Sequence, residues 1–318
     1  MKFDNYLLEL ENNSNKEYVC LDGTSEIVRE IYLDIKKEGY GKIKELLEKI
    51  KIPYQTLYSW VVGSNPIPII KLYEILNLWR IKYNITEREF KEKWDLVYSK
   101  VTGYSQNSAK RVILPRELNH NLAYLIGYFQ GDGHLKKELK KQENSIHFYD
   151  GNLEMLEKIN EIIEKEFGIK GNVYFDSCYR IRVCSRPIYM FFKEVLGLRS
   201  GRKTRSVEVP EVIRNANLQL QLSFIKGFFD AEGTVGENYK NPWLEVGQAS
   251  KDSPCEILIW IREKLNENSI YLSEPKRSQH HEFFRIRIAK RETIKRFFEL
   301  VSSSHPIKKI KFEKIAYG

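Results

Sequence analysis

Two nine-residue stretches decide the fold: Leu125-Ile-Gly-Tyr-Phe-Gln-Gly-Asp-Gly133 and, one hundred positions later, Ile225-Lys-Gly-Phe-Phe-Asp-Ala-Glu-Gly233. The sequence after each copy also recurs, because strand-like alternation, an amphipathic helical stretch, two more strands and a last helix follow in the same order. Each copy is therefore predicted to fold as αββαββα. A duplication of this length is too long for a solenoid repeat and indicates two similar halves related by an approximate two-fold axis.

The repeated stretches are predicted to be helices that pack against each other. Each carries two small residues four positions apart on one helical face, namely Gly127 and Gly131 in the first copy and Gly227 and Ala231 in the second. Small residues at this spacing let two helix backbones approach closely. The two helices should therefore meet along the axis that relates the halves.

Each predicted helix ends in an acid, Asp132 or Glu232, that is followed by a glycine. Gly133 and Gly233 are expected to adopt the left-handed conformation that commonly ends a helix. The two carboxylates would then lie side by side at helix C-termini, where the helix dipoles already contribute negative potential. Such crowding requires either a shared proton or divalent cations. Cations would be the better solution if the site cleaves a phosphodiester, because they activate water and stabilise the leaving oxygen.

The stretches LIGYFQGDG (125–133) and IKGFFDAEG (225–233) resemble the two signature helices of the LAGLIDADG homing endonuclease family, including the penultimate acid of each. The resemblance runs from Leu114-Pro115 to the C-terminus. It implies an α+β fold in which one monomer forms a saddle over double-stranded DNA, with its strands in the major groove. It also implies that Asp132 and Glu232 hold Mg²⁺ or another divalent cation such as Mn²⁺.

The resemblance further implies a catalytic lysine in each half. The basic residue of the family matches Lys203 in the first half and Lys308 in the second, where a lysine would act on the attacking water or on the phosphate. A simple phosphate contact is the alternative for both. The motifs also differ from each other, since Gln130 stands where Asp230 stands in the second copy. This position faces away from the metal in the family, so little effect on catalysis is expected.

Arginines alternate with aliphatic residues in Tyr179-Arg-Ile-Arg-Val-Cys-Ser185 and in Phe284-Arg-Ile-Arg-Ile-Ala-Lys290. A period of two places the aliphatic side chains on one face of a sheet and the cationic ones on the other. A solvated face is the commoner meaning of this pattern, but its recurrence in both halves favours a DNA-binding surface. By alternation, the side chains expected to face DNA are His134, Lys136, Lys140, Arg180 and Arg182 in the first half, and Asn238, Lys240, Gln248, Arg285 and Arg287 in the second.

Residues before about 112 are predicted to form an all-α domain. A helix from Pro53 to Gly63 follows a shorter helix and a turn, and this arrangement resembles a helix-turn-helix of the phage-repressor type. Its candidate DNA contacts are Gln55, Thr56, Tyr58 and Ser59. Plain helical packing is the alternative. Three domains are therefore expected, comprising residues 1–112, 113–210 and 211–318.

The composition agrees with a nucleic-acid-binding protein. The 318 residues include 52 Lys and Arg against 43 Asp and Glu, a net charge of +9 that favours polyanionic partners. No run of about 18 apolar residues occurs, so no membrane span is predicted. The four cysteines form no CxxC pair, which argues against a zinc site or a disulfide framework and suits a cytoplasmic protein.

The prediction is a site-specific, Mg²⁺-dependent homing endonuclease that cuts both DNA strands as a monomer, with an N-terminal domain that lengthens the contact with DNA. A non-cleaving DNA- or RNA-binding regulator, or an intron maturase, is the alternative on the same fold. Deleting residues 1–110 is expected to weaken DNA binding and to leave cleavage intact.

Overall fold

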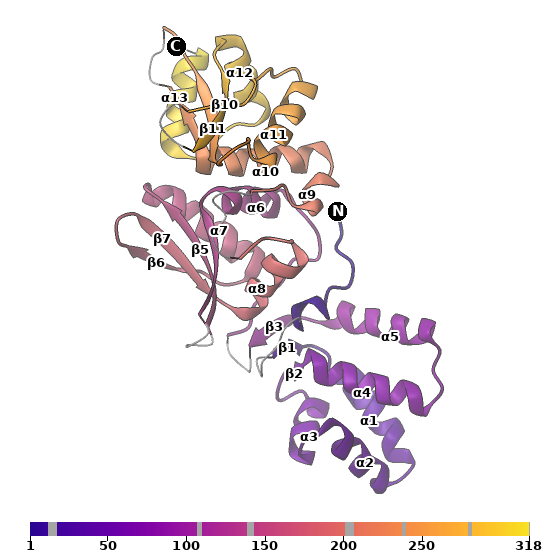
Figure 1. Ribbon diagram of the computed structural model, residues 1–318. Coiled ribbons are helices and arrows are strands. Elements are labelled where there is room, and N and C mark those ends of the chain that lie inside the picture. The colour runs from indigo at the N-terminus through magenta and orange to yellow at the C-terminus, as the bar shows by residue number, and fades with distance from the viewer. Residues whose placement is uncertain are drawn as a thin grey trace. The chain divides into compact units, whose positions relative to one another are not determined.

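The chain folds into two compact units in the computed structural model, which describes residues 1–11, 18–106, 110–138, 143–200, 207–236, 240–278 and 282–317 (Figure 1). The larger unit comprises residues 1–2, 117–184 and 196–318. The smaller unit comprises residues 3–116 and 185–195. The three-domain division at residues 112 and 210 stays a prediction.

The larger unit contains the two repeats except for the last helix of the first repeat, and the elements of both follow the predicted order. The first half contains α6 (His120–Asp132), β4 (Gly133–Glu138), β5 (Glu143–Asp150), α7 (Leu153–Phe167), β6 (Asn172–Phe175) and β7 (Tyr179–Cys184). After α9 (Glu211–Arg214), the second half contains α10 (Leu218–Glu232), β8 (Gly233–Val235), β9 (Leu244–Ala249), α11 (Glu256–Glu267), β10 (Lys276–Arg277), β11 (Phe283–Ile288), α12 (Arg291–Leu300) and α13 (Pro306–Tyr317).

Helices α6 and α10 lie side by side and are joined through their small residues (Figure 1). A Cβ atom added to Gly127 would lie 2.0 Å from the carbonyl oxygen of Phe224, and one added to Gly227 would lie 2.0 Å from that of Tyr124. The backbones therefore touch at two symmetric positions, as the spacing predicted. Both helices also begin alike, because the side chains of Asn119 and Asn217 each accept a hydrogen bond from a first-turn amide.

Each half contributes a four-stranded antiparallel sheet, with strand order β4-β5-β7-β6 in the first half and β10-β11-β9-β8 in the second. One face of each sheet is apolar and buried, as Ile181 and Val183 show in β7 and Ile286 and Ile288 show in β11. Helix α6 contacts β4 and β5, and α10 contacts β8 and β9. The predicted alternation in these strands is confirmed.

The predicted conformation at the two helix ends is wrong. Gly133 and Gly233 do not adopt a left-handed conformation, because each helix passes directly into a strand and their φ values are −104° and −77°. Glycine is needed there for space: a Cβ atom at either position would lie 2.3 Å from the ring of Phe129 or Phe229. In the second half, the pairing of β10 with β11 begins only at Lys276.

The smaller unit is mainly helical but is not all-α. It contains η1 (Glu9–Glu11), β1 (Val19–Asp22), α1 (Ser25–Lys37), α2 (Tyr40–Ile50), α3 (Tyr54–Val62), β2 (Ile67–Pro68), α4 (Ile69–Lys82), α5 (Glu87–Lys100) and β3 (Gly103–Gln106). Strands β2, β1 and β3 form a small antiparallel sheet. Residues 103–106 pair with β1, so the predicted all-α domain contains a sheet.

A segment from the middle of the chain completes the smaller unit. Residues 185–195 form α8 (Arg186–Met190) and the π-helical turn η3 (Phe191–Val195). The ring of Phe191 lies 5.7 Å from that of Phe3 and 5.5 Å from that of Tyr6. Although this segment occupies the place of the last helix in the first repeat, its apolar side chains pack with N-terminal residues.

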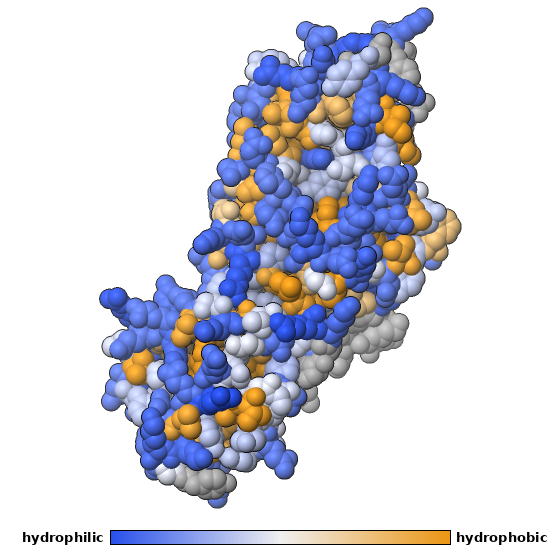
Figure 2. Space-filling model, turned by 180° about the vertical axis from the view of Figure 1, so that it is seen from behind, coloured by the Kyte–Doolittle hydropathy of each residue, from blue (hydrophilic) through white to orange (hydrophobic). Residues whose placement is uncertain are grey.

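Within the described part of the chain, no helix is both long and apolar enough to cross a membrane. On the face of the molecule shown in Figure 2, polar side chains predominate, with apolar side chains scattered among them.

Candidate metal site and nucleic-acid interface

The two predicted catalytic acids lie at the adjacent ends of α6 and α10. A Cβ atom added to Gly131, the neighbour of Asp132, would lie 2.9 Å from Cγ and 3.7 Å from the carboxyl carbon Cδ of Glu232. Both acids are partly exposed, so a ligand can reach them. The structure thus brings together two acids one hundred residues apart in the sequence.

The acids supply hard oxygen donors, which suit Mg²⁺ or Mn²⁺. Among the described residues, no group of three or more His, Cys, Asp or Glu side chains could hold a metal ion. Magnesium is commonly bound by one or two carboxylates together with water and substrate phosphate oxygens. Asp132 and Glu232 fit such a shared site, in which DNA would complete the coordination.

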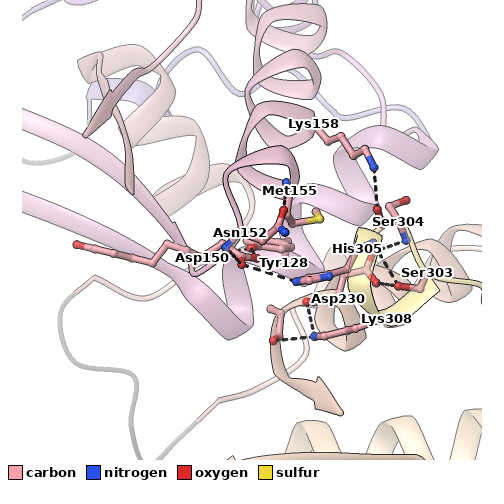
Figure 3. A network of polar contacts seen from close by, with 12 residues as sticks. Tyr128, Asp150, Asn152, Met155, Lys158, Asp230, Ser303, Ser304, His305 and Lys308 are labelled. Atoms are coloured by element: carbon pink, nitrogen blue, oxygen red, sulfur yellow. Dashed lines mark hydrogen bonds and ion pairs between the residues drawn. The ribbon is translucent and has the colours of Figure 1, made fainter. Parts of the chain in front are cut away.

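Lys308 holds the end of α10. Its Nζ atom donates hydrogen bonds to the carbonyl oxygens of Phe229, Asp230 and Ala231 at 3.1, 2.6 and 3.2 Å (Figure 3). Burial lowers the pKa of Lys308, although acids from both halves oppose that shift. Because the ammonium satisfies carbonyls that a helix end leaves unpaired, its observed contacts are those of a helix cap. Lys203, its predicted counterpart, lies outside the described residues.

A buried polar network that includes Asp150, Asp230 and His305 joins the two halves (Figure 3). The hydroxyl of Tyr124 donates to Asp230 at 2.8 Å, and that of Tyr128 donates to Asp150 at 2.5 Å. Burial and the charge of Asp230 raise the pKa of Tyr124 well above its usual value, so this hydroxyl remains a donor. His305 approaches Asp150, with 3.7 Å between Nε2 and Oδ1. Sequence reasoning missed this network because its members come from distant elements.

The first sheet carries a cationic face. The strand register places Arg182 beside His147, and His147 beside His134, while Arg180 lies beside Tyr149. Lys136, further along β4, is exposed. These cations therefore share one face of the sheet, as their alternation predicted, and their contact with DNA stays a prediction. Lys140 lies outside the described residues.

The imidazole of His147 is buried among these cations. Burial, then the charges of Arg180, His134, Arg182 and Lys136, lower its pKa from 6.5 to about 4. His147 is held by Ser145, whose hydroxyl lies 2.9 Å from Nε2. Ser145, His147 and Tyr149 alternate in β5 on the same face, although they were not among the residues predicted to face DNA.

The second sheet has a more neutral face. Arg285 and Arg287 lie on it together, but the carboxylate of Glu245 lies 3.5 Å from the first and 3.1 Å from the second. The guanidinium of Arg287 also lies 4.4 Å from the ring centroid of Trp243. Partial neutralisation by Glu245 was not predicted, because the sequence alone did not fix which residue of β9 lies opposite Arg287.

One predicted contact of the second half is wrong. Gln248 lies opposite Phe284, whereas Arg285 lies opposite Gly247, so Gln248 is on the aliphatic face of the sheet and is buried. Because side chains alternate along a strand, a register displaced by one residue moves each side chain to the other face. Lys240 is exposed in the turn before β9. Asn238 lies outside the described residues.

In the smaller unit, α3 presents the predicted polar side chains to different degrees. Gln55 and Tyr58 are exposed, whereas Thr56 and Ser59 are partly buried. The hydroxyl of Ser59 donates to the carbonyl of Thr56 at 2.7 Å. Helices α2 and α3 are separated by three residues, and α3 ends at Gly63, as predicted, with Gly63 in a left-handed conformation. DNA contact by this helix stays a prediction.

Comparison with known families identifies the repeats. The model of the LAGLIDADG-like domain matches residues 119–197 and 219–302, which together make up just over half of the chain. The protein belongs to the LAGLIDADG-like domain family. Both matches begin near the start of the paired helices α6 and α10 and include the acid at the end of each.

Individual relatives of this LAGLIDADG-like protein share 30% sequence identity or less in the examples that follow. Homing endonuclease I-ApeI of Aeropyrum pernix is 28% identical over 206 residues, covering 61% of this chain and 86% of its own length. The replication factor C small subunit of Methanocaldococcus jannaschii is 30% identical over 192 residues, but the chain spans only 10% of that protein. A crystal structure of I-DmoI with DNA and Mn shares 22% identity at a TM-score of 0.44, covering 59% of this chain and 99% of I-DmoI.

Proposed function

We propose that this LAGLIDADG-like protein is a site-specific DNA endonuclease that hydrolyses both strands of double-stranded DNA with divalent metal, as a monomer. The observation that carries the proposal is the meeting of Asp132 and Glu232 at the ends of two packed helices, one from each half. The relation to homing endonuclease I-ApeI, over most of its length, supports the same reaction class.

Asp132 and Glu232 would hold the cation, Mg²⁺ or Mn²⁺, together with phosphate oxygens of the DNA. When bound, the metal supplies water activation and stabilises the departing oxygen. The protein's own contribution is to place one carboxylate for each strand. Because Gly127 and Gly227 allow the backbones to touch, the separation of the two acids is fixed by helix packing.

The cationic sheet faces would hold the DNA backbone and read its bases. The first face has a positive potential from Arg180, Arg182, His134 and Lys136. In the second face, Glu245 partly neutralises the charges of Arg285 and Arg287. The two faces differ in their side chains, so the DNA target should be asymmetric. Helix α3, through Gln55, Thr56, Tyr58 and Ser59, would extend the contact beyond the sheets.

Selection of cleaved sites from a randomised plasmid library tests the proposal. The full chain should linearise a subset of plasmids with Mg²⁺ or Mn²⁺, whereas Asp132→Asn and Glu232→Gln should bind the selected site without linearising it. Tight binding of a preferred site by the wild-type protein, without any cleavage in either metal, would instead identify a non-cleaving regulator.

A further inference from the structure

Asp230 is fully buried two residues before Glu232 and accepts three hydrogen bonds. The donors are the hydroxyl of Tyr124 at 2.8 Å, the hydroxyl of Ser303 at 2.5 Å and the backbone amide of Ser304 at 2.8 Å. Tyr124 belongs to α6 of the first half. The serines precede α13 and lie beside Asp230 (Figure 3). Asp230 therefore ties the last turn of α10 to two other segments.

The same turn is held a second time from its backbone. The three carbonyl oxygens bound by Lys308 are those of residues 229, 230 and 231, immediately before Glu232. The lysine and the serines that contact Asp230 lie within six positions of each other in the sequence. One short segment, Ser303 to Lys308, thus fixes both the side chain and the backbone of this turn.

The end of α6 is held differently. Gln130, at the position equivalent to Asp230, donates one hydrogen bond to the carbonyl oxygen of Glu208 at 2.6 Å. A carboxylate bound by three donors is held more strongly than a neutral amide bound through one, because charge-assisted hydrogen bonds are the stronger kind and a buried charge is costly to leave unpaired. Asp230 therefore restrains the end of α10 more strongly than Gln130, at the equivalent position, restrains the end of α6.

We propose that Asp230 is a positioning residue that fixes Glu232 through the last turn of α10, so that loosening it slows hydrolysis of the one DNA strand served by Glu232. The proposal rests on the endonuclease function proposed above. It assigns a functional consequence to the sequence difference between Gln130 and Asp230. A position that faces away from the acids would then still govern the relative rates of the two cuts.

Hydrogen exchange tests the restraint without any cleavage. Asp230→Asn keeps the size of the side chain but replaces one carboxylate oxygen with an NH₂ group. This group is a donor and cannot accept the hydrogen bonds that the oxygen accepts in the wild type. Amide exchange at residues 229–233 should rise about tenfold, which corresponds to the loss of roughly one charge-assisted hydrogen bond, while residues 129–133 stay unchanged. Gln130→Ala, the matched variant, should accelerate exchange only at residues 129–133. Equal changes at both ends, or none, would overturn the proposal.

Strand-resolved cleavage tests the consequence. With Asp230→Asn, nicked DNA should accumulate because one strand is cut about tenfold more slowly than in the wild type, with little change in DNA affinity. Tyr124→Phe leaves Asp230 with two hydrogen-bond donors, so it should slow cleavage of the same strand by a smaller factor. This variant replaces Asp230→Asn in the test if Asp230→Asn does not fold. Uniform slowing of both strands would indicate a general structural role and would overturn the proposal. If the wild-type protein never cuts DNA, the endonuclease function fails, while the exchange measurements still decide the restraint.

Discussion

The imidazole Nε2 of His305 lies 3.7 Å from Oδ1 of Asp150, and this pair joins the segment before α13 to the end of β5. Burial alone would raise the pKa of Asp150, but hydrogen bonds from His305, Tyr128 and the amide of Asn152 bring it below the usual value. The carboxylate form is therefore favoured in the folded state. The stabilisation is present above the pKa of the unfolded chain, near 4, and is lost as the pH falls below it.

Asp150→Asn should therefore lower stability most at pH 6 and least at acid pH. The difference in unfolding free energy between wild type and variant should be about 1–3 kcal/mol at pH 6, because a buried charged hydrogen-bond acceptor is lost. This difference in unfolding free energy should decrease as the pH falls through 4 and below. Urea unfolding at a series of pH values measures it. A difference that stays constant from pH 6 to pH 3 would show that Asp150 contributes through packing alone.

The pKa of His147 should rise when DNA binds. In the free protein it is lowered to about 4 by burial and by neighbouring cations. Phosphates on this face would offset the charges of Arg180, Arg182, His134 and Lys136, so the charged imidazole would become less unfavourable. Titration of isotope-labelled histidine by nuclear magnetic resonance, with His147→Gln for assignment, gives both values. An unchanged pKa in the complex would place the DNA backbone elsewhere.

His147 should also make stability pH-dependent in the free protein. A histidine whose folded pKa lies below its unfolded value of 6.5 favours folding above that value. The contribution is lost progressively as the pH falls from 6.5 to about 4, because the unfolded chain binds the additional proton. His147→Gln should flatten the stability profile in that window, and unaltered slopes would contradict the low pKa.

Gly127→Ala should destabilise the larger unit strongly. The added methyl group would meet a carbonyl oxygen of α10 at 2.0 Å, so the helices must separate, at a cost of about 1–3 kcal/mol or more. Gly151→Ala is the matched control, because its added Cβ meets nothing within 4 Å. Its effect should stay within about 0.5 kcal/mol of zero. Thermal unfolding of both variants decides whether close backbone contact holds the halves together.

Glu245→Gln should strengthen DNA binding. The carboxylate lies on the face that carries Arg285 and Arg287, so its removal frees positive charge for phosphates. The slope of log affinity against log salt concentration should steepen by up to about 0.9, the value for one additional phosphate contact. Glu267→Gln, which removes an acid paired with Lys264 on α11, is the control and should leave the slope unchanged. Equal slopes for all three proteins would exclude this face from the interface.

Deletion of residues 1–110 should prevent proper folding, contrary to the modular behaviour expected from the sequence. Phe191 and Phe192 are buried in the smaller unit, and the deletion removes Phe3 and Tyr6 from around Phe191. Exposing each phenylalanine costs about 1.5–3 kcal/mol. The truncated chain should aggregate, and replacing both phenylalanines with serine should restore solubility. A soluble truncation with unchanged thermal stability would show that residues 185–195 do not depend on the N-terminal unit.

Much of the fold follows from local pattern, because the repeated order of elements and the alternation of Arg180 and Arg182 with aliphatic residues depend on neighbours along the chain. The small residues at 127 and 227 likewise predicted the helix contact. Register does not follow from local pattern, and Gln248 was therefore assigned to the wrong face.

The network of Asp230, Asp150 and His305 lay beyond sequence reasoning for a different reason. Each member satisfies a buried polar group from another segment, and such pairings are set by tertiary packing. Sequence reasoning treated Asp230 only as a position that faces away from the metal. Its burial and its three donors emerge only when α6, α10 and the segment before α13 come together.

The placement of residues 185–195 limits how this protein can be recombined with its relatives. The chain passes between the two compact units near residues 2, 116, 184 and 195, so no single cut separates them. A chimera that keeps residues 1–116 of this protein but takes the first half from another would remove Phe191 from its contacts with Phe3 and Tyr6. Grafting experiments should therefore transfer residues 1–116 together with residues 185–195.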